Sequence, residues 1–244
     1  MPGKGSGGME ELLQELTERL VRAAGENIKS VVVYGSAATG EYRKNHSDLN
    51  VMCVLESAAT ADLERLHEPL SWWKRKGFPL PYVFTEPELR ASADIFAIEL
   101  LDIKANHRML HGKDFFPTLN VPMRFHNQQV ERELRTNLVR LRQGILAVPP
   151  RDRVLVNLME AAVSAFVTLF RHALMAFGEP APSSKREVVE RAAEVVKVSP
   201  EAFLLILDIH EGKRKSADVD AQKTLQNYVE LAERMAEETD RRLA

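Results

Sequence analysis

Small polar residues follow a run of β-branched residues near the start of the chain. Residues 31–34 read Val-Val-Val-Tyr and lead directly into Gly35 and Ser36. A strand that ends in Gly-Ser and turns into a helix brings together free backbone N–H groups, the serine hydroxyl and the positive end of the helix, and these groups bind phosphate. The sequence therefore predicts a phosphate-binding turn at Gly35 and Ser36.

Two oxygen-bearing side chains, Asp48 and Asn50, occur at the start of the next apolar run. Side chains two residues apart on a strand point to the same face of a sheet. Mg²⁺ is commonly held by one or two carboxylates together with the phosphate oxygens of a substrate. The spacing therefore predicts a Mg²⁺ site beside the phosphate-binding turn.

A third acid is expected on a later strand. Residues 94–103 are largely apolar and are predicted to form a strand that contains Glu99 and Asp102. A charged carboxylate inside such a strand needs a metal ion or an ionic partner, so a salt bridge is the alternative for Glu99. Asp102 is expected on the opposite face and at the cap of a short helix over residues 104–111. We favour Glu99 as the third acid, and Asp102 replaces it if a bulge shifts the strand.

The elements that position these residues are predicted from hydrophobic periodicity. Helices are expected over residues 9–24 and 61–76, where apolar residues recur at helical spacing. Strands are expected over residues 28–34 and 49–55, which are β-branched runs, and a short apolar segment covers residues 81–85. Residues 1–8 are Gly-rich and are expected to form a disordered tail.

The second half of the chain is predicted to be helical throughout. Residues 116–122 contain two prolines and are expected to form a linker. Helices are expected over residues 125–147, 152–177, 185–196, 200–211 and 219–243. The second of these helices is apolar on nearly all sides, which is typical of the central helix of a bundle. The predicted fold class is α+β, with an N-terminal domain over residues 9–115 and an all-α bundle over residues 123–244.

Composition excludes several classes of protein. The 244 residues carry 33 basic and 35 acidic side chains, a net charge of −2, which gives no general attraction to nucleic acid or anionic lipid. No uninterrupted apolar stretch of about 18 residues and no charged-then-apolar leader are found. We therefore expect a cytoplasmic protein without a membrane partner. The single cysteine, Cys53, forms no internal disulfide.

Gly35-Ser36, followed by Ser47-Asp48 and Asn50 and then a later acid, resembles the signature of the nucleotidyltransferase superfamily related to DNA polymerase β. Its minimal and kanamycin-type bacterial members show a similar pattern. The resemblance covers about residues 10–111 and implies a mixed sheet with flanking helices, followed by a helical, HEPN-like domain. In that family the Gly-Ser pair binds the β and γ phosphates of a nucleoside triphosphate. Three acids hold two Mg²⁺ ions, which activate an acceptor hydroxyl for in-line attack on the α phosphate.

Carried onto this chain, the resemblance implies two sets of site residues. The catalytic and metal-binding set is Asp48, Asn50 and Glu99. The nucleotide-binding set is Gly35, Ser36, Arg43, Lys44 and Ser47. Asn50 departs from the family, because an amide offers a neutral oxygen where the pattern has a carboxylate. Two closely spaced Mg²⁺ ions would be poorly neutralised by the remaining charges, whereas binding of a single metal stays compatible with the pattern.

Three functions follow as hypotheses. The leading one is a Mg²⁺-dependent transfer of a nucleoside monophosphate to a hydroxyl acceptor, either a small molecule or a protein. The alternative is a catalytically degenerate nucleotide-binding or partner-binding module, because of Asn50, and the third is a two-domain scaffold. HEPN ribonucleases have an arginine four to six residues before a histidine, a spacing that none of the seven histidines here shows. The helical half is therefore expected to shape the acceptor cleft, a homo-oligomer interface or a contact with a separate protein.

Overall fold

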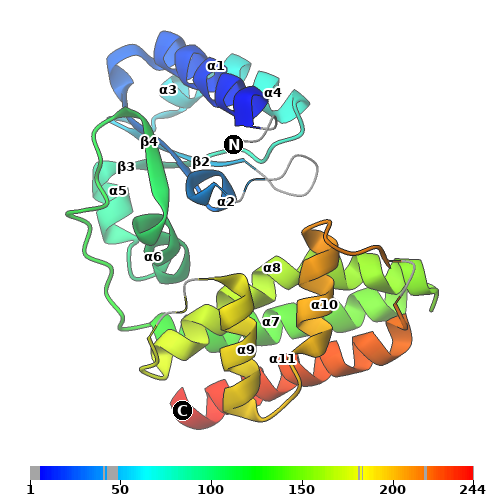
Figure 1. Ribbon diagram of the computed structural model, residues 1–244. Coiled ribbons are helices and arrows are strands. Elements are labelled where there is room, and N and C mark those ends of the chain that lie inside the picture. The colour runs from blue at the N-terminus through cyan, green and yellow to red at the C-terminus, as the bar shows by residue number, and fades with distance from the viewer. Residues whose placement is uncertain are drawn as a thin grey trace. The chain divides into compact units, whose positions relative to one another are not determined.

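The computed structural model describes residues 6–40, 42, 49–180, 182, 184–216 and 219–243. The chain forms two compact units, Met1–Pro122 and Met123–Ala244. Strands are found in the first unit and long helices make up the second (Figure 1). The α+β fold class predicted from the sequence is therefore confirmed.

The first unit contains four strands and seven helical segments among its described residues. In chain order they are α1 (Ser6–Ala24), η1 (Gly25–Asn27), β1 (Ile28–Tyr34), α2 (Ser36–Thr39), β2 (Asn50–Leu55), α3 (Thr60–Arg65), α4 (His67–Arg75), β3 (Tyr82–Thr85), α5 (Glu86–Ala91), α6 (Ala97–Ala105) and β4 (His107–Gly112). Helix α1 begins at Ser6, so the last three residues of the expected tail are helical.

The sheet is mixed and has the strand order β3-β2-β1-β4. Strand β1 is antiparallel to β2 and to β4, whereas β2 and β3 are parallel. The register pairs Tyr34 with Asn50 and with His107, so the end of β1 lies between the starts of β2 and β4. Strand β3 begins opposite Met52 of β2. The end of β1 and the starts of the other three strands therefore lie at one end of the sheet.

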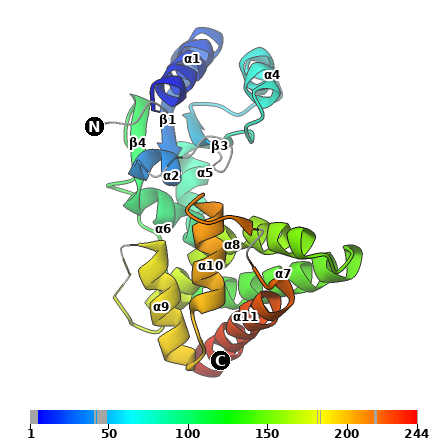
Figure 2. The same cartoon turned by 45° about the vertical axis from the view of Figure 1, so that its right-hand side comes forward.

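Helices cover both faces of this sheet (Figure 2). On one face, Val31 and Val33 are buried in a cluster with α1 and with Trp73 of α4. On the other face, Val32 is buried with apolar residues of α5 and α6, and Tyr34 packs against this second cluster. This alternation of side chains along β1 is the period of two that a strand imposes. It places Tyr34 on the face covered by α5 and α6.

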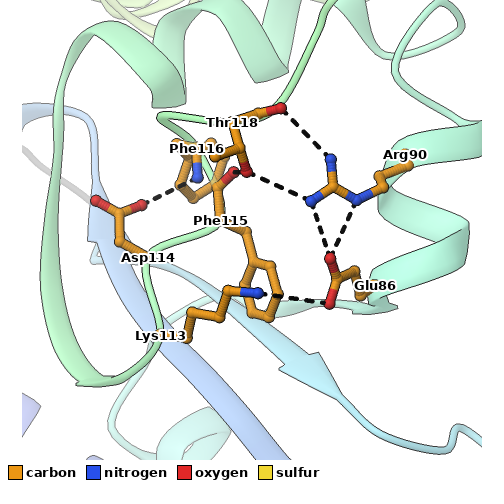
Figure 3. Close-up of polar contacts among 7 residues, drawn as sticks. All are labelled: Glu86, Arg90, Lys113, Asp114, Phe115, Phe116 and Thr118. Carbon is orange, nitrogen blue, oxygen red and sulfur yellow. Dashed lines mark hydrogen bonds and ion pairs between the residues drawn. The ribbon is translucent and has the colours of Figure 1, made fainter.

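The segment after β4 is fastened to α5 by a polar network (Figure 3). Arg90 donates two hydrogen bonds to Glu86, at 2.9 and 3.1 Å, and further bonds to the hydroxyl and carbonyl oxygens of Thr118, each at 3.4 Å. Lys113 forms an ion pair with the same Glu86 at 3.9 Å. The network holds residues 113–118 against the helix that follows β3.

Two predicted elements of this unit are wrong. Residues 94–103 were expected to form a strand, but Ala97–Ala105 is the helix α6; residues 104–111 were expected to be helical, but His107–Gly112 is the strand β4. A short apolar run is compatible with a buried helix as well as with a strand, because periodicity alone does not separate them. Strand β4 exists because it pairs with β1, a partner more than 70 residues away in the sequence. Tertiary pairing therefore overrides the local pattern.

The second unit is a bundle of helices. Its members are α7 (His126–Ala147), α8 (Asp152–Ala176), α9 (Lys185–Val196), α10 (Glu201–His210) and α11 (Ala221–Leu243). These bounds confirm the five helices predicted for this half. Helix α8 contacts each of the other four helices, so it is the central helix, as its sequence indicates.

Aromatic side chains form the centre of this bundle. Phe166 and Phe170 of α8 are fully buried against Phe203 of α10 and Tyr228 of α11. The rings of Phe203 and Tyr228 stack with centroids 3.9 Å apart. By length and composition α8 would also suit a membrane span. In this structure its apolar side chains, Phe166 and Phe170 among them, form the core of the bundle.

Candidate functional site

The phosphate-binding turn predicted from the sequence lies where β1 ends. Gly35 has φ 72° and ψ −149°, a backbone conformation that only glycine adopts readily. The chain then enters the four-residue helix α2 at Ser36, and the N–H groups of Ala38 and Thr39 bond to the Gly35 carbonyl oxygen, at 2.9 and 3.3 Å. The first N–H groups of a helix have no acceptor within the helix, so those at the start of α2 can bind a ligand. Gly35 thus turns the backbone between the buried strand β1 and helix α2, so that the first amides of α2 lie at the end of the strand.

Asn50 lies next to this turn. It is the first residue of β2 and the cross-strand partner of Tyr34. Its side-chain Nδ2 lies 3.5 Å from the position that a Cβ atom on Gly35 would occupy. The buried Leu49, fully excluded from solvent, anchors the chain just before β2. The structure therefore brings Gly35 and Asn50 together, as the sequence motif predicts.

Four of the predicted site residues lie outside the described residues. These are Arg43, Lys44, Ser47 and Asp48. Their roles in binding phosphate or metal stay predictions.

Glu99 is on a helix, not on the strand expected for it. It occupies the first turn of α6 and is exposed, while its neighbours Ile98 and Leu100 are buried and Leu100 packs with side chains of the sheet. Asp102, the alternative third acid, lies in the same helix, so the expected capping position before a later helix is also wrong. Burial raises the pKa values of Tyr34 and Tyr82, and the charge of Glu99 adds to both shifts.

Two tyrosines complete this end of the sheet, and sequence reasoning did not single them out. The rings of Tyr34 and Tyr82 stack with centroids 6.5 Å apart and planes inclined by 11°. Tyr34 is half-buried, and burial is the main cause of its raised pKa, followed by the charges of Tyr82 and Glu99. Tyr82, on the edge strand β3, is 43% exposed. Only the parallel pairing of β2 with β3 brings Tyr82 here, and the sequence around residues 81–85 carries no signal of that pairing.

His107, the other cross-strand neighbour of Tyr34, has structural partners. Its Nδ1 lies 2.8 Å from the carbonyl oxygen of Ile103, and its Nε2 lies 3.1 Å from Asp114. Asp114 also accepts a hydrogen bond from the N–H of Phe116 at 3.0 Å. These contacts tie the start of β4 to the segment that follows it. His107 therefore stabilises the backbone on the β4 side of Tyr34, whereas Asn50 lies on the β2 side.

The described residues at this end of the sheet offer few oxygen ligands for a metal ion. They offer the amide oxygen of Asn50 and the carboxylate of Glu99, while burial and neighbouring charge raise the pKa of Tyr34, so that its hydroxyl stays neutral. Within the described ranges, no group of three or more His, Cys, Asp or Glu side chains gathers in a way that could hold a metal ion. One carboxylate from Asp48, the Asn50 amide and substrate phosphates would match the usual surroundings of Mg²⁺.

Most of the first unit is similar to a known domain family. Residues 9–100 match the family model described as nucleotidyltransferase domain. Gly35, Ser36 and Asn50 all lie within the matched residues. A comparison with curated proteins finds no match.

A solved structure shares the fold of the chain. It is the spectinomycin adenyltransferase AAD(9) from Enterococcus faecialis, crystallised with ATP and spectinomycin. The match has a TM-score of 0.56 and covers 93% of this chain and 98% of that chain, at 16% sequence identity. At this identity the similarity concerns the fold. It extends over both halves of the chain, the half with the sheet and the helical half.

Proposed function

We propose that the N-terminal unit binds a nucleoside triphosphate and transfers its nucleoside monophosphate to a hydroxyl acceptor. The observation that carries this proposal is the Gly35 turn with Asn50 beside it, inside the residues that match a nucleotidyltransferase domain. The similar AAD(9) structure holds ATP and spectinomycin. That pairing supports a nucleoside triphosphate and a small hydroxyl-bearing molecule as the two substrates here.

In this proposal the terminal phosphates lie against the amides after Gly35 and the hydroxyl of Ser36. Arg43, Lys44 and Ser47 add charge and hydrogen bonds to the triphosphate. Asp48 and Asn50 would hold a Mg²⁺ ion, which supplies neutralisation of the charge on the phosphate oxygens and on the leaving pyrophosphate. The metal-binding role predicted for Glu99 stays a prediction.

The second candidate function is binding without turnover, and Asn50 favours it. A neutral amide in place of a carboxylate removes one negative charge from the site. If the reaction depends on that charge, the loss weakens transition-state stabilisation, and each ~1.4 kcal/mol lowers the rate tenfold.

A cytoplasmic location, a homo-oligomer and a protein partner of the helical unit also stay predictions.

Pyrophosphate release tests these alternatives. The native chain, Asp48→Ala and Asn50→Asp are each incubated with ATP, GTP, CTP or UTP, with and without Mg²⁺, while nucleotide binding is measured in parallel. We expect Mg²⁺-dependent release by the native chain, no release by Asp48→Ala and faster release, by about tenfold or more, by Asn50→Asp.

Binding by the native chain with release only by Asn50→Asp would establish the binding module instead. If neither the native chain nor Asn50→Asp binds a nucleotide, both functions are wrong.

A further inference from the structure

Two stacked tyrosine rings lie beside the candidate site, and the proposed contacts to phosphate and metal do not use them. Tyr34 ends β1, and Tyr82 begins the edge strand β3. Their ring centroids are 6.5 Å apart, and the ring of Phe84 lies 6.3 Å from that of Tyr82. Tyr82 is nevertheless 43% exposed. This tyrosine pair, Tyr34 and Tyr82, therefore presents ring surface to solvent in an orientation that neighbouring rings restrict.

The backbone places the tyrosine pair next to the phosphate-binding turn. Tyr34 is bonded directly to Gly35 and is the cross-strand partner of Asn50. Cross-strand partners in an antiparallel pair share a face of the sheet and have Cβ atoms about 4.5–5.5 Å apart. The Tyr34 ring and the Asn50 amide therefore start from adjacent points on one face. Tyr82 adds its ring at stacking distance from Tyr34.

The strand order sets the direction in which a bound nucleotide runs. Gly35 follows β1, Asn50 begins β2 and Tyr82 begins β3. The inference rests on the proposed function, which places the terminal phosphates at Gly35 and the metal ion at Asn50. The nucleoside then continues from the α phosphate toward β3, where the ring of Tyr82 is exposed. On the β4 side the ring of His107 already packs against Phe116, with centroids 4.6 Å apart.

We infer that the tyrosine pair stacks on the nucleobase of the bound nucleoside triphosphate and that the site accepts all four bases. An aromatic side chain stacks on any base, because every base has a π face, so stacking alone selects weakly among bases. The residues on either side of Tyr82, Pro81 and Val83, carry no hydrogen-bonding group in their side chains. A ring that its neighbours already restrict also loses little entropy when a base stacks on it.

The test compares nucleotides with a ligand that lacks a base. Calorimetric titration of the full chain uses Mg²⁺ with ATP, GTP, CTP or UTP, and Mg²⁺ with inorganic tripolyphosphate. We expect the native chain to bind the four nucleotides within about tenfold of one another, the purines more tightly. Tyr82→Ala should weaken binding of each nucleotide by about 5- to 150-fold and leave the affinity for tripolyphosphate unchanged. Unchanged tripolyphosphate binding also shows that this variant is folded.

Two further variants separate the ring from other effects of the substitution. Tyr82→Phe keeps the ring and removes only the hydroxyl, so it should restore nucleotide affinity close to that of the native chain. Leu63→Ala is the matched control, because Leu63 is 42% exposed and lies on α3, which contacts α1 and α4. Its affinities for nucleotides and tripolyphosphate should equal those of the native chain.

Three results would overturn the stacking role. Unchanged nucleotide affinity in Tyr82→Ala would leave the proposed function standing, with no base on the tyrosine pair. An equal loss of tripolyphosphate affinity would show that Tyr82 supports the phosphate site and not the base. A preference of the native chain for one base by about a hundredfold or more would indicate hydrogen-bond recognition. A native chain that binds no nucleotide, or nucleotides but not tripolyphosphate, rejects the phosphate site of the proposed function itself.

Discussion

At the scale of single residues, the proposed phosphate site depends on the backbone of Gly35. Its φ of 72° and ψ of −149° lie in a region essentially restricted to glycine, and such strain costs of order 1–3 kcal/mol for other residues. Gly40, at the end of α2, also has a positive φ, but in the left-handed helical region that other residues tolerate better. Neither glycine would bring an added Cβ into a clash, so the two differ mainly in backbone strain and position.

This difference predicts separate effects of two substitutions. Gly35→Ala should lower the free energy of unfolding by about 1–3 kcal/mol and weaken nucleotide binding at least tenfold, because the amides after it are turned away from the phosphates. Gly40→Ala should cost about 1–2 kcal/mol with little change in nucleotide affinity. Urea unfolding and nucleotide titration measure the two quantities. Equal losses of affinity in both variants would argue against a phosphate site at Gly35.

The residue types in the sequence predicted only part of the candidate site. Gly35 and Asn50 lie together as expected, since they are adjacent to paired strand ends. The positions of Tyr34 and Tyr82 relative to Glu99 follow from strand order and helix packing, which no local pattern encodes. The amide at Asn50 was readable from the sequence, and the choice between the two proposed functions rests on it.

At the scale of elements, the edge strand β4 shows how a distant pairing is secured. Strand β4 ends at Gly112, whose φ is 77°, and the following N–H of Lys113 bonds to the carbonyl oxygen of Lys29 at 2.9 Å. A Cβ atom added at Gly112 would lie 2.0 Å from that same carbonyl oxygen. The glycine is therefore required by the close approach of β4 to β1, and not only by its own conformation.

Gly112→Ala should consequently be more harmful than other glycine substitutions. Backbone strain and the steric clash together predict a loss of about 2–6 kcal/mol in the free energy of unfolding. Gly77→Ala is the control, because Gly77 has a φ of 93° but open space around its Cβ position, and strain alone predicts about 1–3 kcal/mol. Circular dichroism during urea unfolding compares the two. A Gly112→Ala protein as stable as Gly77→Ala would show that β4 does not pack as described.

At the scale of the whole molecule, the sequence predicted the division into a sheet-containing half and a helical half better than it predicted individual strands. Long amphipathic helices such as α9 carry their own periodicity and are capped by local signals, here the box of Ser184 and Glu187. Strand β4 and helix α6 lack such signals, and their identity depends on contacts with β1 and with the cluster around Met52. Gly35 and Asn50, by contrast, lie at the ends of β1 and β2, two strands that the β-branched runs of the sequence predict.

The most direct test of the account is a hydrogen-exchange footprint of the full chain with and without a Mg²⁺-nucleoside triphosphate. Binding at the proposed site should slow exchange most in residues 34–40 and at the start of β2, because these backbone amides lie beside the phosphates. The same footprint on Gly35→Ala should be weakened in step with its loss of affinity. Protection confined to the helical unit, or no protection at saturating nucleotide, would contradict the assignment of the nucleotide site.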